Sequence, residues 1–217
     1  SEENPYMCGF PVSVIDKYVD ILVSKKYTVV IIDQYDDEMG SDSPKQRKVS
    51  EIISPSTYIQ DVASYKSNYL MSIYFYKFKN RKTKEYVLSY ALGIIELSIG
   101  KMYLYESMSR STSTTTDKKL LFENLYRMIL KYNPSEIILF SDEDDELYNE
   151  IITSLNLNEQ ELSIHNQFNG KYNKNILDII FQELTIKQIY GIEKIGFLNP
   201  IEFINLQCHP QLLIVFT

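Results

Sequence analysis

The chain has 217 residues, of which 44% are hydrophobic and 24% charged, and its formal net charge is −7. This is the composition of a globular protein with a buried core, and the acidic balance argues against a chain coated in nucleic acid, although local basic patches can still bind it. No apolar run approaches the roughly 18 residues that span a bilayer, and the first residues lack the pattern of a signal peptide. The two distant cysteines, Cys8 and Cys208, build no disulfide scaffold, which indicates an intracellular, reducing compartment.

The first part of the chain, residues 1 to 56, is predicted to hold one helix and two strands. Apolar residues recur at helical spacing over residues 13 to 24, with Ser13 as the expected N-cap. The run YTVVIID at 27 to 33 reads as a buried strand, and residues 49 to 53 form a second strand after a long polar loop. We expect a small core with an open edge.

The second part is larger and alternates strands with helices. The expected elements are strands at residues 68–79, 85–97 and 101–106, a helix at 118–132 capped by Thr116 or Asp117, a strand at 136–140, a helix at 147–155, a strand at 162–168 and a helix at 176–189. Three consecutive strands predict an antiparallel meander. The whole order predicts an α/β fold of the ribonuclease H type.

Several short segments occur in an order that resembles one known family. MCGFP, a helix, IIDQ and KQRKVSEIISPST are similar to the mismatch-recognition domain of the MutS family of DNA mismatch repair proteins. GIIELSIGKMYLYE, and a helix followed by NPSEIILF, resemble the connector domain of that family, which has a ribonuclease H-like fold. The resemblance implies the C-terminal part of a mismatch-binding domain at residues 1–56, a connector domain at 57–199 and the entry to a helical core at 200–217.

The sequence also departs from the family pattern. Val12 and Ser13 stand where bacterial members have an aromatic residue and a His, and Ser56 stands where they have Gly, so the last turn is expected to differ. These differences indicate a divergent branch, organellar or of a giant virus. The family probes mismatches with a Phe-x-Glu motif ahead of the Gly-Pro turn, which the six residues before Met7 do not contain.

No phosphate-binding loop of the Gly-x-x-x-x-Gly-Lys-Ser/Thr type occurs in the chain. The resemblance therefore implies a non-enzymatic N-terminal fragment whose mismatch probe and ATPase lie outside it. No cofactor is expected in this chain, and ATP and Mg are expected in the parent protein only.

Four residues are candidate DNA contacts by resemblance: Met7, Lys45, Arg47 and Lys48. In the family the Arg of the basic pair lies by the DNA backbone, and Arg and Lys suit phosphate contacts that position a protein without reading sequence. A solvated loop is the alternative for the KQRK segment, and packing beside the turn is the alternative for Met7.

A metal-dependent nuclease is a second hypothesis, because ribonuclease H-type enzymes gather carboxylates around two metal ions. Asp142, in the SDEDDE run, and Glu123 occupy suitable sequence positions. Against this, the first strand of the second part, YLMSIYFY, carries no acid, and acids in a first helical turn are explained by the helix dipole. His165 and His209 are too far apart in the chain to predict a zinc site.

We therefore expect the non-catalytic N-terminal part of a MutS-like protein, which binds DNA weakly and couples to a MutL-like partner through its connector, in a dimeric parent and without a membrane role. A stand-alone protein-interaction module is the third hypothesis. The basic KFKNRKTK segment at 77 to 84 suits DNA, an acidic partner or simple solubility. The apolar residues 212 to 216 are expected to meet partners outside the chain.

Overall fold

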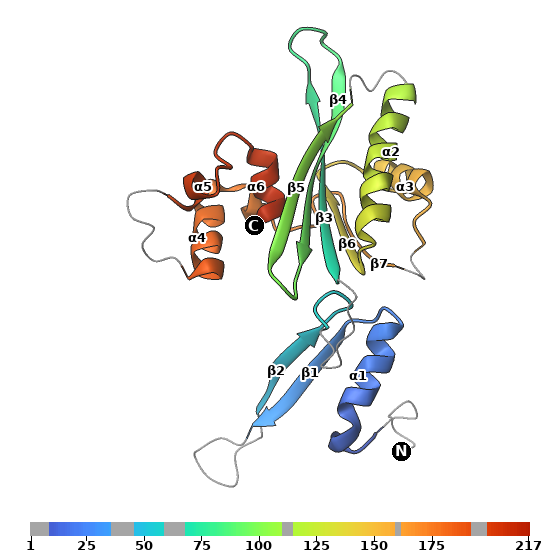
Figure 1. Cartoon of the computed structure of the whole chain (residues 1–217), viewed down its shortest axis with the longest axis vertical. Helices are drawn as coiled ribbons and strands as arrows, with labels where there is room; N and C mark the ends of the chain where they lie inside the picture. The colour runs from blue at the N-terminus through green and yellow to red at the C-terminus, as the bar shows by residue number, and fades with distance from the viewer. Residues whose placement is uncertain (1–8, 36–45, 59–67, 110–114, 159–161, 192–198) are drawn as a thin grey trace. The chain divides into compact units, whose positions relative to one another are not determined.

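The structure is a computed structural model that describes residues 9–35, 46–58, 68–109, 115–158, 162–191 and 199–217. The chain divides into two compact units, Ser1–Ser64 and Tyr65–Thr217, which are called unit 1 and unit 2 (Figure 1). Both combine helices with β-structure, so the predicted α/β class is confirmed.

Unit 1 is a helix packed on a two-stranded antiparallel ribbon. Its elements are η1 (Val12–Val14), α1 (Ile15–Ser24), β1 (Val29–Tyr35) and β2 (Gln46–Ile53). The α1 residues Val19 and Val23 pack against Ile53 of β2, because apolar residues four apart share one face of a helix. This small cluster is what joins the helix to the ribbon.

The predicted cap at Ser13 is wrong. Ser13 lies inside the 3₁₀ turn η1, which closes with Val14 N donating to Pro11 O at 3.1 Å. The N-cap of α1 is Val14, whose side chain makes no capping hydrogen bond. The 3₁₀ turn therefore displaces the start of the α-helix past the residue that could cap it.

Unit 2 is built on a five-stranded mixed sheet in the order β5-β4-β3-β6-β7. The strands β3, β4 and β5 form an antiparallel meander, β6 runs parallel to β3, and β7 runs parallel to β6. Helix α2 leads from β5 to β6, and α3 leads from β6 to β7. The bounds are β3 (Tyr69–Lys79), β4 (Tyr86–Glu96), β5 (Lys101–Met108), α2 (Thr115–Tyr132), β6 (Glu136–Ser141), α3 (Asp145–Leu155) and β7 (Ser163–Gln167).

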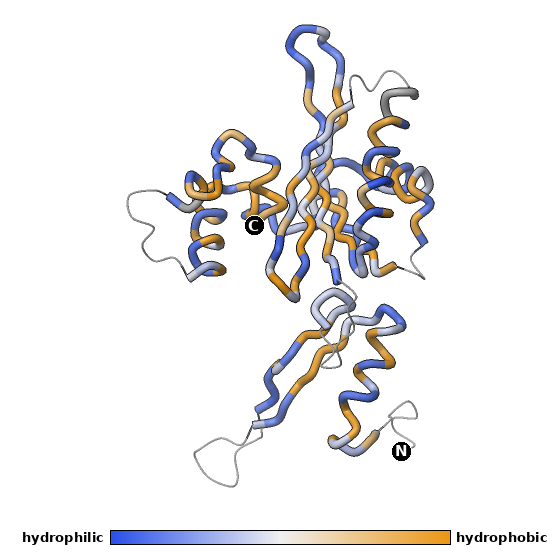
Figure 2. The backbone as a smooth tube through the Cα atoms, viewed as in Figure 1, coloured by the Kyte–Doolittle hydropathy of each residue, from blue (hydrophilic) through white to orange (hydrophobic). Residues whose placement is uncertain are grey.

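Helices α2 and α3 cover one face of this sheet and enclose the main core (Figure 1). Leu125 of α2 and Ile151 of α3 are fully buried against strand residues such as Phe75. Figure 2 shows hydrophobic residues along the central strands and the sheet-facing sides of these helices. Because α2 begins at Thr115, the predicted cap residues Thr116 and Asp117 lie within its first turn.

The described elements in the last part of the chain are helices: η2 (Lys174–Leu177), α4 (Ile179–Tyr190), α5 (Pro200–Phe203) and α6 (Pro210–Phe216). The helix predicted over 176–189 is present as α4 but begins three residues later, because Asp178 adopts an extended conformation and caps α4 by accepting from Ile180 N at 2.7 Å. Among the described residues, no helix is both long and apolar enough to cross a membrane.

The expectation that residues 212 to 216 stay exposed for outside partners is also wrong. Helix α6 packs on the sheet face opposite α2 and α3, where Leu213 and Val215 are buried. Gly93 of β4 permits this contact, since a Cβ there would lie 2.9 Å from the carbonyl oxygen of Val215. The apolar residues of this helix complete the chain's own core.

Candidate nucleic-acid interface

A β-bulge in the ribbon of unit 1 determines which way its basic residues face. Ile31 pairs with Glu51, but the next residue of β1, Ile32, pairs with Val49, so Ser50 is the extra residue of β2. The Ser50 hydroxyl donates to the carbonyl oxygen of Ile31 at 3.3 Å. Because side chains alternate along a strand, one inserted residue exchanges the two faces for every position beyond it.

The bulge thereby brings Arg47 to the face of the ribbon that points away from α1. Arg47 pairs with Gln34, which shares a face with Ile32, whereas Lys48 lies on the opposite face with its Nζ 5.9 Å from the centre of the Tyr35 ring. Both basic side chains are exposed, and neither forms an ion pair with another described residue. Their charges are therefore available to an anion.

Beyond Arg47 and its partner Gln34, the side chains of this face are apolar and exposed in the described part of unit 1. Its aliphatic side chains are between about half and three-fifths exposed: Val30 49%, Ile32 57%, Val49 57% and Ile52 61%. An exposed apolar strip with an arginine at its end favours an interface with a partner over the alternative of a solvated loop, since monomeric proteins rarely expose such a strip.

The four candidate contact residues fall into two groups. Met7 and Lys45 lie outside the described residues. Arg47 and Lys48 lie within β2, where the sequence predicts a loop, because pairing with β1 extends the strand to Gln46. Backbone pairing with β1 fixes the positions of Arg47 and Lys48, so both side chains extend from defined points on the strand.

The turn after β2 is stabilised by hydroxyl groups. The Thr57 hydroxyl accepts from Ser54 N at 2.7 Å, and the Ser54 carbonyl accepts from Tyr58 N at 3.0 Å. Ser56 is buried and is not among the described residues with positive φ. This turn therefore does not need the glycine that the family pattern would place there.

The acidic residues after β6 cap a helix and form ion pairs. Asp144 caps α3 by accepting from Leu147 N at 3.1 Å, Asp142 lies 3.5 Å from Lys174 Nζ, and Glu143 pairs with Lys77. The described residues include no group of three His, Cys, Asp or Glu residues that could hold a metal ion. The nuclease hypothesis is not supported.

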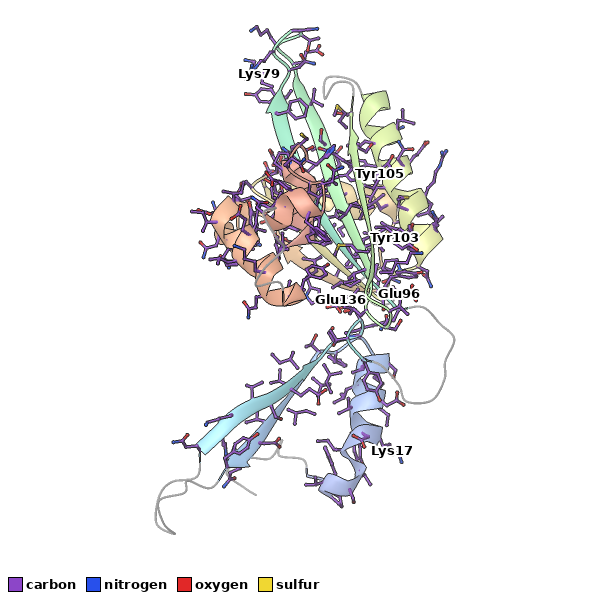
Figure 3. All side chains as sticks on the ribbon, turned by 60° about the vertical axis from the view of Figure 1, so that its left-hand side comes forward. Lys17, Lys79, Glu96, Tyr103, Tyr105 and Glu136 are labelled. Atoms are coloured by element: carbon purple, nitrogen blue, oxygen red, sulfur yellow. The ribbon has the colours of Figure 1, made fainter. Side chains whose placement is uncertain are left out.

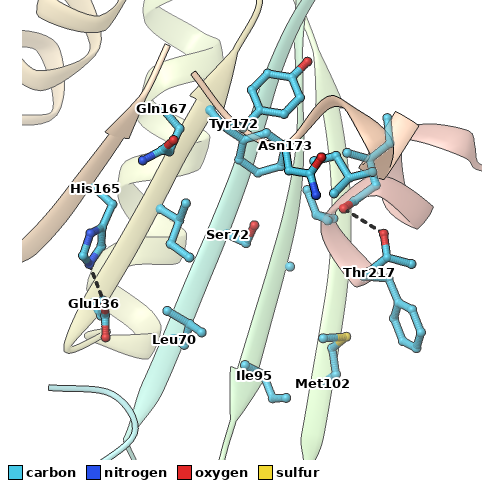
Figure 4. A pocket seen from close by; sticks show the side chains of 17 residues that line it. Leu70, Ser72, Ile95, Met102, Glu136, His165, Gln167, Tyr172, Asn173 and Thr217 are labelled. Carbon is cyan, nitrogen blue, oxygen red and sulfur yellow. Dashed lines mark hydrogen bonds and ion pairs between the residues drawn. The ribbon is translucent and has the colours of Figure 1, made fainter. Parts of the chain in front are cut away.

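A groove of about 550 Å³ lies on the sheet face of unit 2 that α6 partly covers (Figure 4). Leu70, Ile95 and Phe140 contribute apolar surface, and the groove also contains a side-chain contact in which His165 Nε2 lies 2.6 Å from Glu136 Oε1. Glu136 is buried and His165 is about two-fifths exposed.

Sequence reasoning missed this pair because 29 positions separate its members. Only the parallel register of β6 and β7, in which Ile138 faces His165, brings them together. No local motif signals such a contact, because it depends on which strands become neighbours.

Comparisons with known proteins agree with the segment order. Residues 1–62 match the family model MutS domain I. The DNA mismatch repair protein MutS of Ruminiclostridium cellulolyticum is 36% identical over 155 residues, which covers 69% of this chain and 16% of the relative. The MutS of Caldicellulosiruptor bescii is 28% identical over 225 residues, which covers 98% of this chain and 23% of the relative.

A viral protein is also similar. A putative DNA mismatch repair protein mutS homolog of Acanthamoeba polyphaga mimivirus is 26% identical over 63% of this chain and 11% of its own length. The chain thus spans less than a quarter of the length of these relatives. Because the Ruminiclostridium protein is 36% identical over 69% of this chain and residues 1–62 match MutS domain I, the chain belongs to the MutS family. Its first 62 residues match domain I and not an ATPase domain.

Proposed function

We propose that this chain is the non-catalytic N-terminal part of a MutS-like DNA mismatch repair protein, in which Arg47 and Lys48 contact the DNA backbone. The observation that carries the proposal is the bulge at Ser50, which turns Arg47 away from α1 in a region that matches MutS domain I. Guanidinium and ammonium groups bind phosphates without regard to sequence. The chain is therefore expected to bind DNA weakly and without preference for a mismatch.

Unit 2 is proposed to act as a connector domain of the ribonuclease H-like type. Its strand order β5-β4-β3-β6-β7, with an antiparallel meander followed by two parallel strands, supports this assignment. The proposed role is to couple DNA binding to the rest of the parent protein and to offer a docking surface to a MutL-like partner. ATP and Mg binding and dimer formation are assigned to the parent protein.

The DNA contact is tested by fluorescence anisotropy with a labelled homoduplex at low salt. The double variant Arg47→Gln/Lys48→Gln is expected to bind about five- to tenfold more weakly than the wild type, because removal of each phosphate interaction lowers both the affinity and the salt slope.

The matched control is Lys17→Gln/Lys25→Gln, which removes the same charge from exposed lysines of the same unit; Lys17 lies on α1 (Figure 3). Equal weakening in the two double variants would refute a specific contact at β2. A clear preference of the wild type for mismatched DNA would contradict the expected mismatch-blind binding.

A further inference from the structure

The hairpin that joins β3 to β4 ends in a turn with defined geometry. The ladder runs out to the pair Lys79 and Tyr86, and Asn80 N donates to the Glu85 carbonyl at 2.8 Å. The Asn80 side chain accepts from Lys82 N at 2.9 Å, and Lys84 N donates to the Asn80 carbonyl at 2.9 Å. Such Asx bonding fixes the backbone of the turn, so its side chains start from a rigid base.

Residues 79 to 86, which we call the basic tip, concentrate positive charge in an acidic chain. They contain four basic residues and one acid, Glu85, whereas the whole chain has a net charge of −7. Arg81, Lys82 and Lys84 are exposed and form no ion pair with any described residue. The tip therefore carries an excess of positive charge.

The contrast with Lys77, two residues before the tip, is informative. Lys77 lies on the same strand as Lys79, but its Nζ is 2.5 Å from Glu143 Oε2. The fold thus neutralises the cation nearest the body of unit 2. It leaves the cations of the tip unneutralised.

An exposed aromatic ring accompanies these cations. Tyr86 is 56% exposed, and Lys79 Nζ lies 5.8 Å from the centre of its ring; Lys79 is labelled in Figure 3. Surfaces that bind single-stranded nucleic acid combine cations, which follow the phosphates, with aromatic rings on which bases stack. An acidic polypeptide would use the cations but has no bases to place on the ring.

We propose that the basic tip binds a single-stranded nucleic acid, with Arg81, Lys82 and Lys84 on its phosphates and Tyr86 stacked on an unpaired base. This site is in unit 2 and is additional to the duplex contact proposed at Arg47 and Lys48. The charges and the ring of this site all come from the basic tip, so the proposal does not depend on the duplex contact.

The test uses the full chain and a labelled single-stranded 20-nucleotide oligomer in an anisotropy titration. The triple variant Arg81→Gln/Lys82→Gln/Lys84→Gln is expected to bind at least tenfold more weakly at about 50 mM salt. The slope of log affinity against log salt should fall by about 2, since each phosphate contact contributes roughly 0.7 for single strands.

A matched control removes the same charge elsewhere on unit 2. Lys119→Gln/Arg127→Gln/Lys187→Gln also replaces one arginine and two lysines, all exposed and on helices, and should change the affinity less than threefold. Far-ultraviolet circular dichroism confirms that both triple variants are folded. Equal weakening in the two variants overturns the proposal.

The aromatic part of the site has its own test. Tyr86→Phe should retain the affinity for the single strand and Tyr86→Ala should lower it several-fold, because stacking needs the ring but not the hydroxyl. Tighter binding of a polyglutamate of equal charge than of the oligomer would assign the tip to an acidic polypeptide and overturn the proposal. The same titration in the Arg47→Gln/Lys48→Gln background shows whether the single-strand site at the tip and the duplex contact at β2 can be lost independently of each other.

Discussion

The two units differ in how much apolar surface they bury: unit 2 has a large core, and unit 1 has a small core beside an exposed apolar face. In the described residues of unit 2, one cluster joins eighteen buried side chains from the sheet, α2, α3 and the turn after β7. In those of unit 1, three buried side chains hold α1 to the ribbon, and the other face of the ribbon is apolar and exposed. Unit 2 therefore has the larger core, whereas unit 1 has a small core and leaves one face of its ribbon exposed.

The largest expected effect comes from opening the core of unit 2. Leu125 on α2 is fully buried, so Leu125→Ala should lower the free energy of unfolding by about 2 to 5 kcal/mol in a urea titration. Leu130 on the same helix is 61% exposed, and Leu130→Ala should cost less than about 0.5 kcal/mol. Similar destabilisation in both variants would contradict the position of this core.

A smaller and local effect is expected in unit 1. Val23 is 6% exposed, and Val23→Ala should cost about 1 to 2 kcal/mol because two buried methyl groups are removed. Amide hydrogen exchange should speed up in α1 and β1 while the strands of unit 2 keep their protection. Val12→Ala, at an 82% exposed position, is the control. Faster exchange throughout unit 2 would show that the two units do not unfold separately.

The smallest effect concerns high pH. Burial, followed by the hydrogen bond that the Tyr76 hydroxyl donates to Glu106 Oε1 at 2.5 Å, raises the pKa of Tyr76 above its usual value near 10. Above pH 10 the unfolded chain loses this proton and the folded chain keeps it, so the stability contributed by Tyr76 declines as the pH rises.

Tyr76→Phe removes this hydroxyl, and the missing hydrogen bond should cost about 1 kcal/mol of stability at pH 7. Between pH 9 and 11 the variant should then lose less stability than the wild type. Denaturant titrations at each pH measure the difference. Tyr27→Phe, which alters an exposed tyrosine of unit 1, is the control. Parallel pH profiles for the wild type and Tyr76→Phe would refute this role of the hydroxyl.

The order of elements was predictable because hydrophobic periodicity is a local property. The strand at 136 to 140 and the helix at 118 to 132 carry strong patterns, and β6 and α2 lie close to those bounds. The place of Arg47 was not predictable in the same way. Its polar surroundings read as a loop, but backbone pairing with β1 overrides that composition and extends β2 to Gln46.

Contacts between strands that lie apart in the sequence were the second feature that could not be predicted. The bulge at Ser50 decides the face of Arg47, and the register of β6 with β7 creates the Glu136–His165 pair. Neither depends on a residue pattern within one segment. The cations of the KFKNRKTK segment were visible in the sequence, but only the structure separates the paired Lys77 from the tip.

The central claim is that β2 of unit 1 offers a DNA-backbone contact, and the salt dependence of duplex binding tests it most directly. The slope of log affinity against log salt should fall by about 1 to 2 in Arg47→Gln/Lys48→Gln, because each duplex phosphate that a cation neutralises contributes roughly 0.9. It should not change in Lys17→Gln/Lys25→Gln. An unchanged slope in the first variant would contradict the account, since the exposed cations of the ribbon would then bind no phosphate.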